Sequence, residues 1–394
     1  MTRLRALTAG ESHGPALVAT CEGLPAGIPV SVERFSQELA RRRLGHGRSP
    51  RMEFEEDRLE VVGGVRHGRT LGSPVAVLIR NTEWPKWTDA MAVEAPADPD
   101  AVAATGRGEP LTRPRPGHAD LVGSLKYGYR DVRNALERAS ARETAARVVI
   151  GTLAMDLLEA VGVTVLSHVV RIGEEAVTEP VLPSAEDRAA IDADPVRCLE
   201  ADASQRMQAR IDRAKDERDT LGGVIEVVVL GLPVGLGSHV QADRKLDARL
   251  AAAVLSVQAM KGVEFGLGFE GAATPGSRAH DEITWTGTAY ARASNRAGGL
   301  EGGMTTGEPV VLRAAMKPLS SLPRPLGTVD IDTHEPAEAI TQRSDACAVP
   351  RAGVVLEHVV AFVVADALLE KTGGDTVAEV QRNLGGWLED VASR

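Results

Sequence analysis

Aromatic residues, cysteines and excess basic charge are scarce in this sequence. Aromatic side chains make up 3% of its 394 residues, and the formal net charge is -10 at pH 7. Proteins that bind nucleic acids typically have a basic surface and aromatic rings on which bases stack. We therefore expect no nucleic acid partner, although arginines gathered in one cleft of an acidic protein can still attract a small anion.

The three cysteines, Cys21, Cys198 and Cys347, are odd in number and have no C-x-x-C spacing. Cysteine usage of this kind argues against a disulfide framework and is typical of a reducing compartment. We therefore expect reduced thiols and a cytoplasmic location.

The sequence also lacks a clear membrane segment. Gly10 and Glu11 interrupt the apolar start of the chain before the hydrophobic core of a signal peptide can form. Residues 352–369 are largely apolar, but they include two acidic residues and a histidine. These polar groups favour a helix in the protein core or at a subunit interface over a membrane span, so we expect no membrane partner.

Standard nucleotide and metal motifs are missing as well. Residues 231–237 follow a predicted strand and are rich in glycine, but Val240 stands where a G-x-G-x-x-G motif requires its last glycine. No glycine-lysine-serine or glycine-lysine-threonine triplet forms a P-loop, and the nine histidines show no metal-ligand spacing. The sequence therefore supports neither a Rossmann site nor a metal centre.

The remaining composition is that of a globular protein with a sizeable core, with 43% hydrophobic and 25% charged residues. No low-complexity linker divides the chain, so we expect a single domain over residues 1–394, of α/β or α+β class with mixed sheets. The predicted strands are residues 4–8, 16–21, 163–172 and 224–230. The predicted helices are residues 31–43, 134–160, a segment from 184, 204–218, 243–260, 352–371 and 376–391. Residues 271–291 show no clear period and are predicted to form a loop or a flexible hairpin.

Three segments of the chain have similar sequences. Residues 70–77, 220–227 and 305–312 each combine a threonine-glycine turn with a strand rich in β-branched residues. A repeated supersecondary unit of this kind indicates a possible internal duplication. The match is short, so chance similarity stays open as the alternative.

The stretch from residue 113 to residue 147 organises the predicted site. It begins as a rigid loop, in which two prolines fix the backbone and Gly117 frees it just before His118. It continues as a predicted helix of mostly small residues, on which Arg138 and Arg142 lie four residues apart and share a face. Because buried arginines require anionic partners and few acids lie on that face, we expect a bound anion.

A second arginine cluster covers residues 41–51, and His13 lies in a glycine-bounded turn. For Arg41 and Arg43, a solvated, salt-bridged surface is an equally good interpretation. The residues alone thus predict an enzyme with a multi-arginine pocket for a small polyanion and two candidate proton donors, His13 and His118.

At these same positions the sequence resembles the chorismate synthases, and the resemblance covers almost the whole chain. The segments that carry it are Gly10-Glu11-Ser12-His13-Gly14, residues 41–51, Asn81-Thr82-Glu83-Trp84, Arg115-Pro116-Gly117-His118-Ala119-Asp120, residues 137–144, Asn295-Arg296-Ala297-Gly298-Gly299, residues 317–321 and residues 343–351. Many family members have histidine before the aspartate and proline after it, where this chain has Ser344-Asp345-Ala346. The resemblance therefore implies a role for Asp345 and leaves that of residue 344 open.

The resemblance implies a fold, a reaction and a cofactor. The family fold is a single large β-α-β-α sandwich around central helices, assembled as a homotetramer. The family reaction is a 1,4-elimination of phosphate from 5-enolpyruvylshikimate 3-phosphate, which gives chorismate in the shikimate pathway. It requires reduced FMN without net oxidation, and NADPH is a possible reductant of that flavin.

The resemblance also implies residue roles. His13 would protonate the departing phosphate, His118 would support the anionic reduced flavin, and Asp345 would assist the flavin nitrogen that takes the ring proton. The arginines at substrate-binding positions are Arg42, Arg48, Arg51, Arg115, Arg142 and Arg343. The residues at flavin-binding positions are Arg138, Ala139, Ser140, Gln258, Ala259, Gly302, Lys317, Pro318, Leu319, Ser320, Ser321 and Arg343.

Two alternatives from other classes make different predictions. A non-catalytic scaffold for polyanions would use the arginines but would bind no flavin. A metal-dependent phosphotransferase would need acidic Mg²⁺ ligands close to the arginines.

Overall fold

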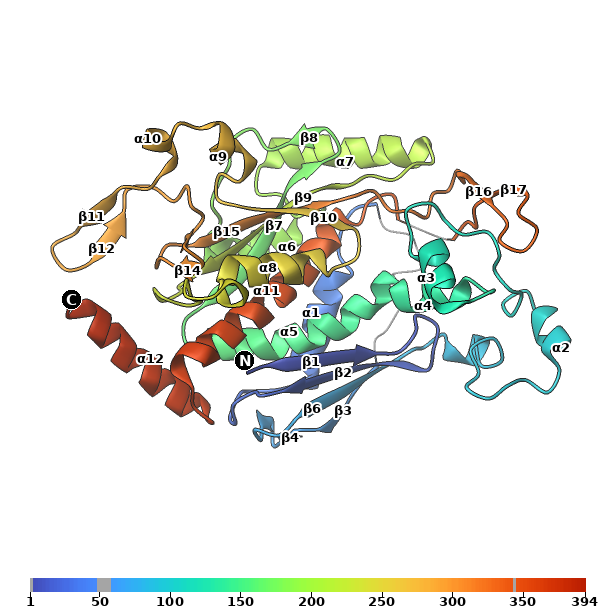
Figure 1. Cartoon of the computed structure of the whole chain (residues 1–394), viewed down its shortest axis with the longest axis horizontal. Coiled ribbons are helices and arrows are strands. Elements are labelled where there is room, and N and C mark those ends of the chain that lie inside the picture. Colours follow the sequence, from blue (N-terminus) through green and yellow to red (C-terminus); the bar gives the residue numbers. More distant parts are fainter. Residues whose placement is uncertain (1–2, 48–57, 343–344) are drawn as a thin grey trace.

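The computed structural model describes residues 3–47, 58–342 and 345–394. In this part of the chain, two antiparallel sheets enclose a layer of helices (Figure 1). The first sheet has the strand order β1-β2-β6-β3, with β1 Arg5–Ala9, β2 Ala16–Glu22, β3 Arg58–Gly63 and β6 Val75–Arg80. The second has the order β10-β15-β9-β7-β8, with β7 Thr164–Ile172, β8 Glu175–Ala176, β9 Gly223–Leu230, β10 Met260–Phe265 and β15 Val310–Met316.

The helices form one layer between the sheets and another outside the second sheet. The central helices are α1 Val32–Arg42, α5 Thr144–Glu159, α8 Leu246–Leu255 and α11 Val349–Thr372. Helix α5 packs on β2, and α11 packs on β7 and β9. Helix α7 (Ala201–Asp216) packs against β7 and β8 from the other side. The predicted β-α-β-α sandwich with central helices is therefore confirmed.

The other elements are short or peripheral. The remaining α-helices are α2 Pro99–Ala103, α3 Asp120–Tyr127, α4 Arg133–Ala139, α6 Arg188–Ala193, α9 Phe269–Ala273, α10 Gly276–Ala279 and α12 Val377–Ala392. Short paired strands are β4 Val65–Arg66 with β5 Arg69–Thr70, β11 Ile283–Trp285 with β12 Tyr290–Arg292, β13 Leu300–Glu301 with β14 Met304–Thr305, and β16 Gly327–Val329 with β17 Pro336–Glu338. One-turn 3₁₀ helices are η2 Trp84–Lys86, η3 Ala141–Glu143, η4 Ala185–Asp187 and η5 Ala242–Arg244.

The core is built around α11. Among the described helices it is the one long and apolar enough to cross a membrane, yet 94% of its most apolar window is buried inside the protein. Gly151 of α5 lies directly against His358 of α11, so a Cβ atom at residue 151 would overlap the backbone and the Cβ of that histidine. The predicted core helix is therefore confirmed, and a glycine sets the close approach of the two central helices.

Several predicted boundaries need correction. The helix predicted over residues 134–160 is broken at Ser140, whose extended backbone (φ -63°, ψ 142°) separates α4 from the η3–α5 segment. The serine hydroxyl accepts a hydrogen bond from the N–H of Arg142, a local bond that competes with helix continuation. The helix predicted over 243–260 ends at Leu255. Residues 271–291 include most of the β11–β12 hairpin, which agrees with the predicted hairpin, and also the short helix α10 and the end of α9, which were not predicted.

The two halves of the fold repeat one another. The strands β1-β2-β6-β3 correspond in order to β7-β9-β15-β10, with α1 and α5 corresponding to α8 and α11. After β2 and β9 the chain reads Gly23-Leu24-Pro25-Ala26-Gly27-Ile28 and Gly231-Leu232-Pro233-Val234-Gly235-Leu236. Both segments have a left-handed backbone at the first glycine, with φ of 91° and 77°.

Each segment is closed by an equivalent threonine, Thr70 in the first half and Thr305 in the second. The threonine hydroxyl donates to the proline carbonyl over 2.7 and 2.6 Å, and it accepts from the N–H of the last segment residue over 3.0 and 2.9 Å. The internal duplication is thus visible in the hydrogen bonds. The third similar segment, residues 220–227, leads into β9, which corresponds to β2, so its similarity to the other two does not belong to the repeat.

Candidate active site

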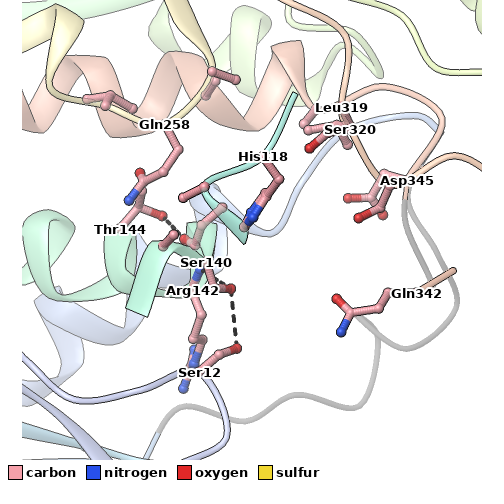
Figure 2. Close-up of a pocket in the computed structure, with 18 of the residues that line it drawn as sticks. Ser12, His118, Ser140, Arg142, Thr144, Gln258, Leu319, Ser320, Gln342 and Asp345 are labelled. Atoms are coloured by element: carbon pink, nitrogen blue, oxygen red, sulfur yellow. Dashed lines mark hydrogen bonds between the residues drawn. The ribbon is translucent and has the colours of Figure 1, made fainter. Parts of the chain in front are cut away.

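A cavity of about 620 Å³ lies where the two halves meet. Its walls come from the end of α1, the residues that follow α8, the starts of α5 and α11, and the loops that follow β1 and β15. Figure 2 shows part of these walls. The lining residues include Ser12, His13, Arg42, Arg115, Gly117, His118, Leu136, Ala139, Ser140, Arg142, Thr144, Gln258, Ala259, Lys317, Leu319, Ser320, Ser321, Gln342, Asp345 and Arg351. The duplication therefore explains the position of the cavity, since matching helix ends from both halves surround it.

Two helix starts make the cavity suitable for anions. Thr144 belongs to the first turn of α5, and Arg351 and Ala352 belong to the first turn of α11, and all three line the cavity. The N-terminus of a helix carries partial positive charge and N–H groups without partners in the helix. Both starts therefore favour negatively charged groups in the cavity.

Three of the predicted arginines come together here from different elements. Arg42 ends α1, Arg115 lies in the loop before α3, and Arg142 lies in η3, and all three line the cavity. The residues Arg42 and Arg115 are each only 6% exposed, so they cannot rely on water to solvate their charge. Guanidinium groups placed in this way match the planar oxyanions of a carboxylate or phosphate.

Because the helix is broken at Ser140, Arg138 does not face the cavity. Arg138 donates to the carbonyl oxygens of Thr8 and Gly10 over 2.9 and 3.2 Å, and to the Thr8 hydroxyl over 2.8 Å. It therefore does not share a cavity-facing surface with Arg142, as a continuous helix would require. Its contacts stabilise the end of β1 and the start of the loop that carries His13.

His118 is held by a buried carboxylate. Its Nδ1 atom lies 2.5 Å from Oδ1 of Asp120, and Arg115 donates to both oxygens of that carboxylate over 2.8 and 3.1 Å. Burial opposes ionisation of Asp120, but the hydrogen bonds from His118 and Arg115 outweigh it and lower the pKa of this carboxyl. Gly117, with φ of 79°, provides the turn that brings His118 back towards Asp120 at the start of α3.

His13 lies in the turn between β1 and β2. Its Nδ1 atom lies 2.8 Å from Oε1 of Glu137, which belongs to α4. The Nδ2 atom of Asn81 donates to the carbonyls of Ser12 and Gly14 over 3.3 and 3.0 Å and so fixes the turn on both sides of the histidine. The two predicted proton donors, His13 and His118, therefore line the same cavity.

Asp345 and most of the segment 317–321 also line the cavity, and this segment lies beside the loop that carries His118 (Figure 2). Asp345 forms an ion pair with Arg351 in the first turn of α11. Lys317 is half-buried, and burial together with the charge of Lys261 lowers the pKa of its ammonium group. The Oε1 atom of Gln258 is buried without a hydrogen-bond partner in the described chain, so it is available to accept from a ligand.

Not every predicted site residue reaches the cavity. Pro318 and Arg138 lie beside it without lining it, and Gly302 lies in the turn between β13 and β14, close to His239 and Met304. Arg48, Arg51 and Arg343 fall outside the described residues, as does Ser344.

The cavity also includes residues that the sequence reasoning did not assign. Ser12 accepts a hydrogen bond from the Ser140 hydroxyl over 3.3 Å, and Gln342 accepts one from Arg115 over 3.2 Å. Arg351, and Glu137 behind His13, lie in segments that carry the family resemblance, so their positions offered a signal, whereas Gln342 offered none.

Arg41 has a structural role. It forms ion pairs with Glu38, Asp192 and Glu357 over 2.6, 2.7 and 2.9 Å, and its side chain is largely buried. The salt-bridged interpretation of this arginine was thus the better one, although the network lies inside the protein. Within the described chain, no group of three or more histidine, cysteine, aspartate or glutamate residues is arranged to hold a metal ion.

Comparisons with known proteins agree with this site. A profile of the family described as chorismate synthase matches residues 4–369. The chain is 60% identical over 392 residues to a chorismate synthase of Salinispora tropica, covering 99% of this chain and 100% of the relative. It is 58% identical over 395 residues to one of Streptomyces coelicolor, covering 100% of both. A solved structure titled "Crystal Structure of Chorismate Synthase" matches with a TM-score of 0.79 and 40% identity, over 100% of both chains.

Proposed function

Since the chain belongs to the chorismate synthase family and is a lyase of aromatic amino acid biosynthesis, we propose that its cavity binds 5-enolpyruvylshikimate 3-phosphate together with reduced FMN. The single observation that carries this proposal is the convergence of His13, His118 and Asp345 with three arginines on one cavity. These residues come from distant parts of the chain, and no surface role requires them to meet.

The anionic groups of the substrate match the positive charges of the cavity. The substrate has a phosphate and two carboxylates, and Arg42, Arg115 and Arg142 line the cavity beside the starts of two helices. A guanidinium can donate two parallel hydrogen bonds to an oxyanion, although Arg115 already donates to Asp120, Ser321 and Gln342 in this structure. We assign substrate binding to these arginines and, by family resemblance, to Arg48, Arg51 and Arg343.

His13 is suited to act as the acid. Phosphate is a poor leaving group while fully charged, so a proton delivered to its oxygen during C–O cleavage accelerates its departure. Glu137 engages Nδ1 of His13, which leaves Nε2 as the ring nitrogen that can donate in the cavity.

The cavity has the groups needed to hold a flavin mononucleotide. Lys317 and the hydroxyls of Ser320 and Ser321 suit a phosphate, and the buried Oε1 of Gln258 suits an imide N–H. When bound in reduced form, the flavin supplies electron density to the breaking C–O bond and recovers it as the ring hydrogen leaves. His118 would donate to the anionic flavin, and Asp345 would assist the flavin nitrogen that takes the ring proton.

The proposal is tested by anaerobic turnover of the substrate with pre-reduced FMN, compared with oxidised FMN plus NADPH. We expect chorismate in the first reaction. Product in the second as well would show that the protein reduces its own flavin, and product in the first alone would show that it needs an external reductant. No product in either would overturn the proposal.

We also propose one domain that assembles as a homotetramer in the cytoplasm. A continuous hydrophobic core joins both halves of the fold, which supports a single domain. The face of the first sheet that is turned away from α5 has exposed apolar side chains, among them Leu7 and Val62, at 73% and 53% exposure. Covering such a face by a second copy removes apolar surface from water. Light scattering after gel filtration measures the assembly, and a monomer would refute it.

A further inference from the structure

His13 is held on two sides by residues that the proposed reaction does not itself use. Its Nδ1 atom lies 2.8 and 3.0 Å from the two oxygens of Glu137, and its backbone N–H donates to Oε2 of the same carboxylate over 2.8 Å. The indole of Trp87 stacks on the imidazole, with ring centroids 4.0 Å apart and planes 25° apart.

The environment of Glu137 requires a positive partner. Its side chain is 1% exposed, and a buried carboxylate is costly unless a cation or several donors compensate it. In the described chain, its side-chain hydrogen bonds are those to the ring and the backbone N–H of His13. An imidazolium at residue 13 balances this charge, whereas a neutral imidazole leaves it uncompensated.

Most of the other charged groups around His13 are cationic and oppose an imidazolium, whereas Glu11 and Asp345 are acidic. The guanidinium carbons of Arg107 and Arg133 lie 5.9 and 5.7 Å from the Trp87 ring centroid. Arg42, Arg142 and His118 line the same cavity, and Glu11 lies in the same turn as His13. Because nearby like charges disfavour an imidazolium, Glu137 is the buried group in direct contact that offsets them.

The same contacts determine which nitrogen can donate. A carboxylate only accepts hydrogen bonds, so Nδ1 of His13 carries a hydrogen. Its Nε2 has no hydrogen-bond partner in the described chain, and the ring lines the cavity. Trp87 covers one ring face and limits rotation of the imidazole.

We propose that Glu137 and Trp87 are positioning residues that hold His13 as an imidazolium whose Nε2–H faces the cavity. This step rests on the proposed function: the Nε2 hydrogen passes to a phosphate oxygen while the C–O bonding pair leaves with the phosphate. His13 is then neutral and must regain a proton before the next turnover.

The first test uses the protein without substrate or flavin, so it does not depend on the proposed function. An imidazolium quenches a stacked indole more strongly than a neutral imidazole, so Trp87 emission reports the charge of His13. The difference in emission between a protein with Trp87 and its Trp87→Phe counterpart isolates this signal from the other three tryptophans. We expect this emission difference to rise with pH in the protein with His13 and to be independent of pH in the His13→Ala background.

Glu137→Gln is the decisive variant. Its amide oxygen can still accept from the backbone N–H of His13, but it carries no charge. We expect the midpoint of the emission change to fall by about one pH unit or more, which is the shift typical of losing an adjacent opposite charge. An unmoved midpoint in a variant with a native circular dichroism spectrum would overturn the proposal.

Kinetics provide the second test, in which the Trp87 variants cover the case that Glu137→Gln does not fold. We expect Glu137→Gln to lower kcat by about 10- to 100-fold with little change in KM, and to move the alkaline limb of the pH profile downward. Trp87→Phe retains a stacking ring and should keep most of the activity, whereas Trp87→Ala should lose most of it. Trp84→Phe, which changes a nearby tryptophan, is the matched control. Full turnover with an unchanged pH profile in Trp87→Ala would contradict the role of Trp87. A wild-type protein without turnover would refute the proposed function, while the emission test would still decide on the contacts of His13.

Discussion

Oδ1 of Asp120 lies 2.5 Å from Nδ1 of His118, at the start of α3. This is the same relationship that joins Glu137 to His13 on the other side of the cavity. In each pair a buried carboxylate holds Nδ1 and leaves Nε2 for a ligand. The two histidines are therefore oriented by the protein before any ligand binds.

His118→Ala should fold normally and lose at least about 100-fold in turnover, because its side chain contributes to the cavity and not to the hydrophobic core. Anaerobic assays with reduced FMN measure the loss, and circular dichroism checks the fold. His239→Ala removes an exposed histidine and should leave turnover unchanged. Full activity of His118→Ala would contradict the assignment.

Arg42→Ala should weaken substrate binding more than flavin binding, whereas Lys317→Ala should weaken flavin binding more. The reason is that Arg42 lies at the end of α1, while Lys317 belongs to the wall assigned to the flavin phosphate. Spectral titration of reduced FMN and calorimetric titration of substrate measure the two affinities. Arg80→Ala, which removes an exposed arginine paired with Glu60, is the control. The reverse ranking would show that the cavity is divided differently.

Gly151→Ala should destabilise the protein by about 1–3 kcal/mol, because the added methyl group would overlap His358 where α5 and α11 cross. Gly386→Ala in α12 meets no atom within 4 Å and should instead stabilise by about 0.5–1 kcal/mol through helix propensity. Urea unfolding measures both. Equal effects of the two substitutions would mean that the helices do not approach as closely as described.

Asp156 should make unfolding stability depend on pH. Burial, with help from the charge of Glu159 and against the attraction of Arg34, raises the pKa of this carboxyl from 3.8 to about 6. The folded state then binds the proton more tightly than the unfolded state, so the contribution of Asp156 is favourable at low pH and is lost as pH rises to about 6.

The test is Asp156→Asn, whose amide oxygen can still accept from Arg34. The difference in unfolding free energy between the variant and wild type should shift by about 1–3 kcal/mol in favour of the variant from pH 4 to pH 7.5. Urea unfolding at both pH values measures this shift. A difference between variant and wild type that does not change with pH, or that shrinks towards pH 7.5, would show that the carboxyl is not destabilised by burial.

Much of the fold could be predicted from sequence. Ser31 and Thr376 cap their helices as predicted, and the four strands predicted with bounds lie within a residue or two of them. Strands β3 and β10 were not predicted, and β10 begins at Met260, the last residue of a predicted helix. The break at Ser140 could not be predicted, because the surrounding small residues all favour a helix and only a local hydrogen bond to Arg142 competes with it.

The duplication was harder to recognise for a physical reason. Its most similar parts are the turns closed by Thr70 and Thr305, where buried hydroxyls and left-handed glycines permit few other residues. The strands and helices between them only need apolar side chains of suitable size, so their sequences have diverged. The segment at Thr220 resembled the other two through composition alone.

The site was predicted mainly through the family resemblance. Composition and loops singled out His13 and His118, but nothing in their spacing placed them in one cavity. Only the folded chain brings the turn after β1 close to the loop before α3. The residues after α8 and the start of α11 join that site because of the duplication, so neither Gln258 nor Arg351 could be assigned by local pattern.

The most direct measurement of the central claim is the stoichiometry of an anaerobic reaction with 5-enolpyruvylshikimate 3-phosphate and pre-reduced FMN. We predict that chorismate and phosphate form in equal amounts, far in excess of the FMN present, and that the flavin is still reduced at the end. Phosphate release without chorismate, or one FMN oxidised for each chorismate formed, would contradict the account.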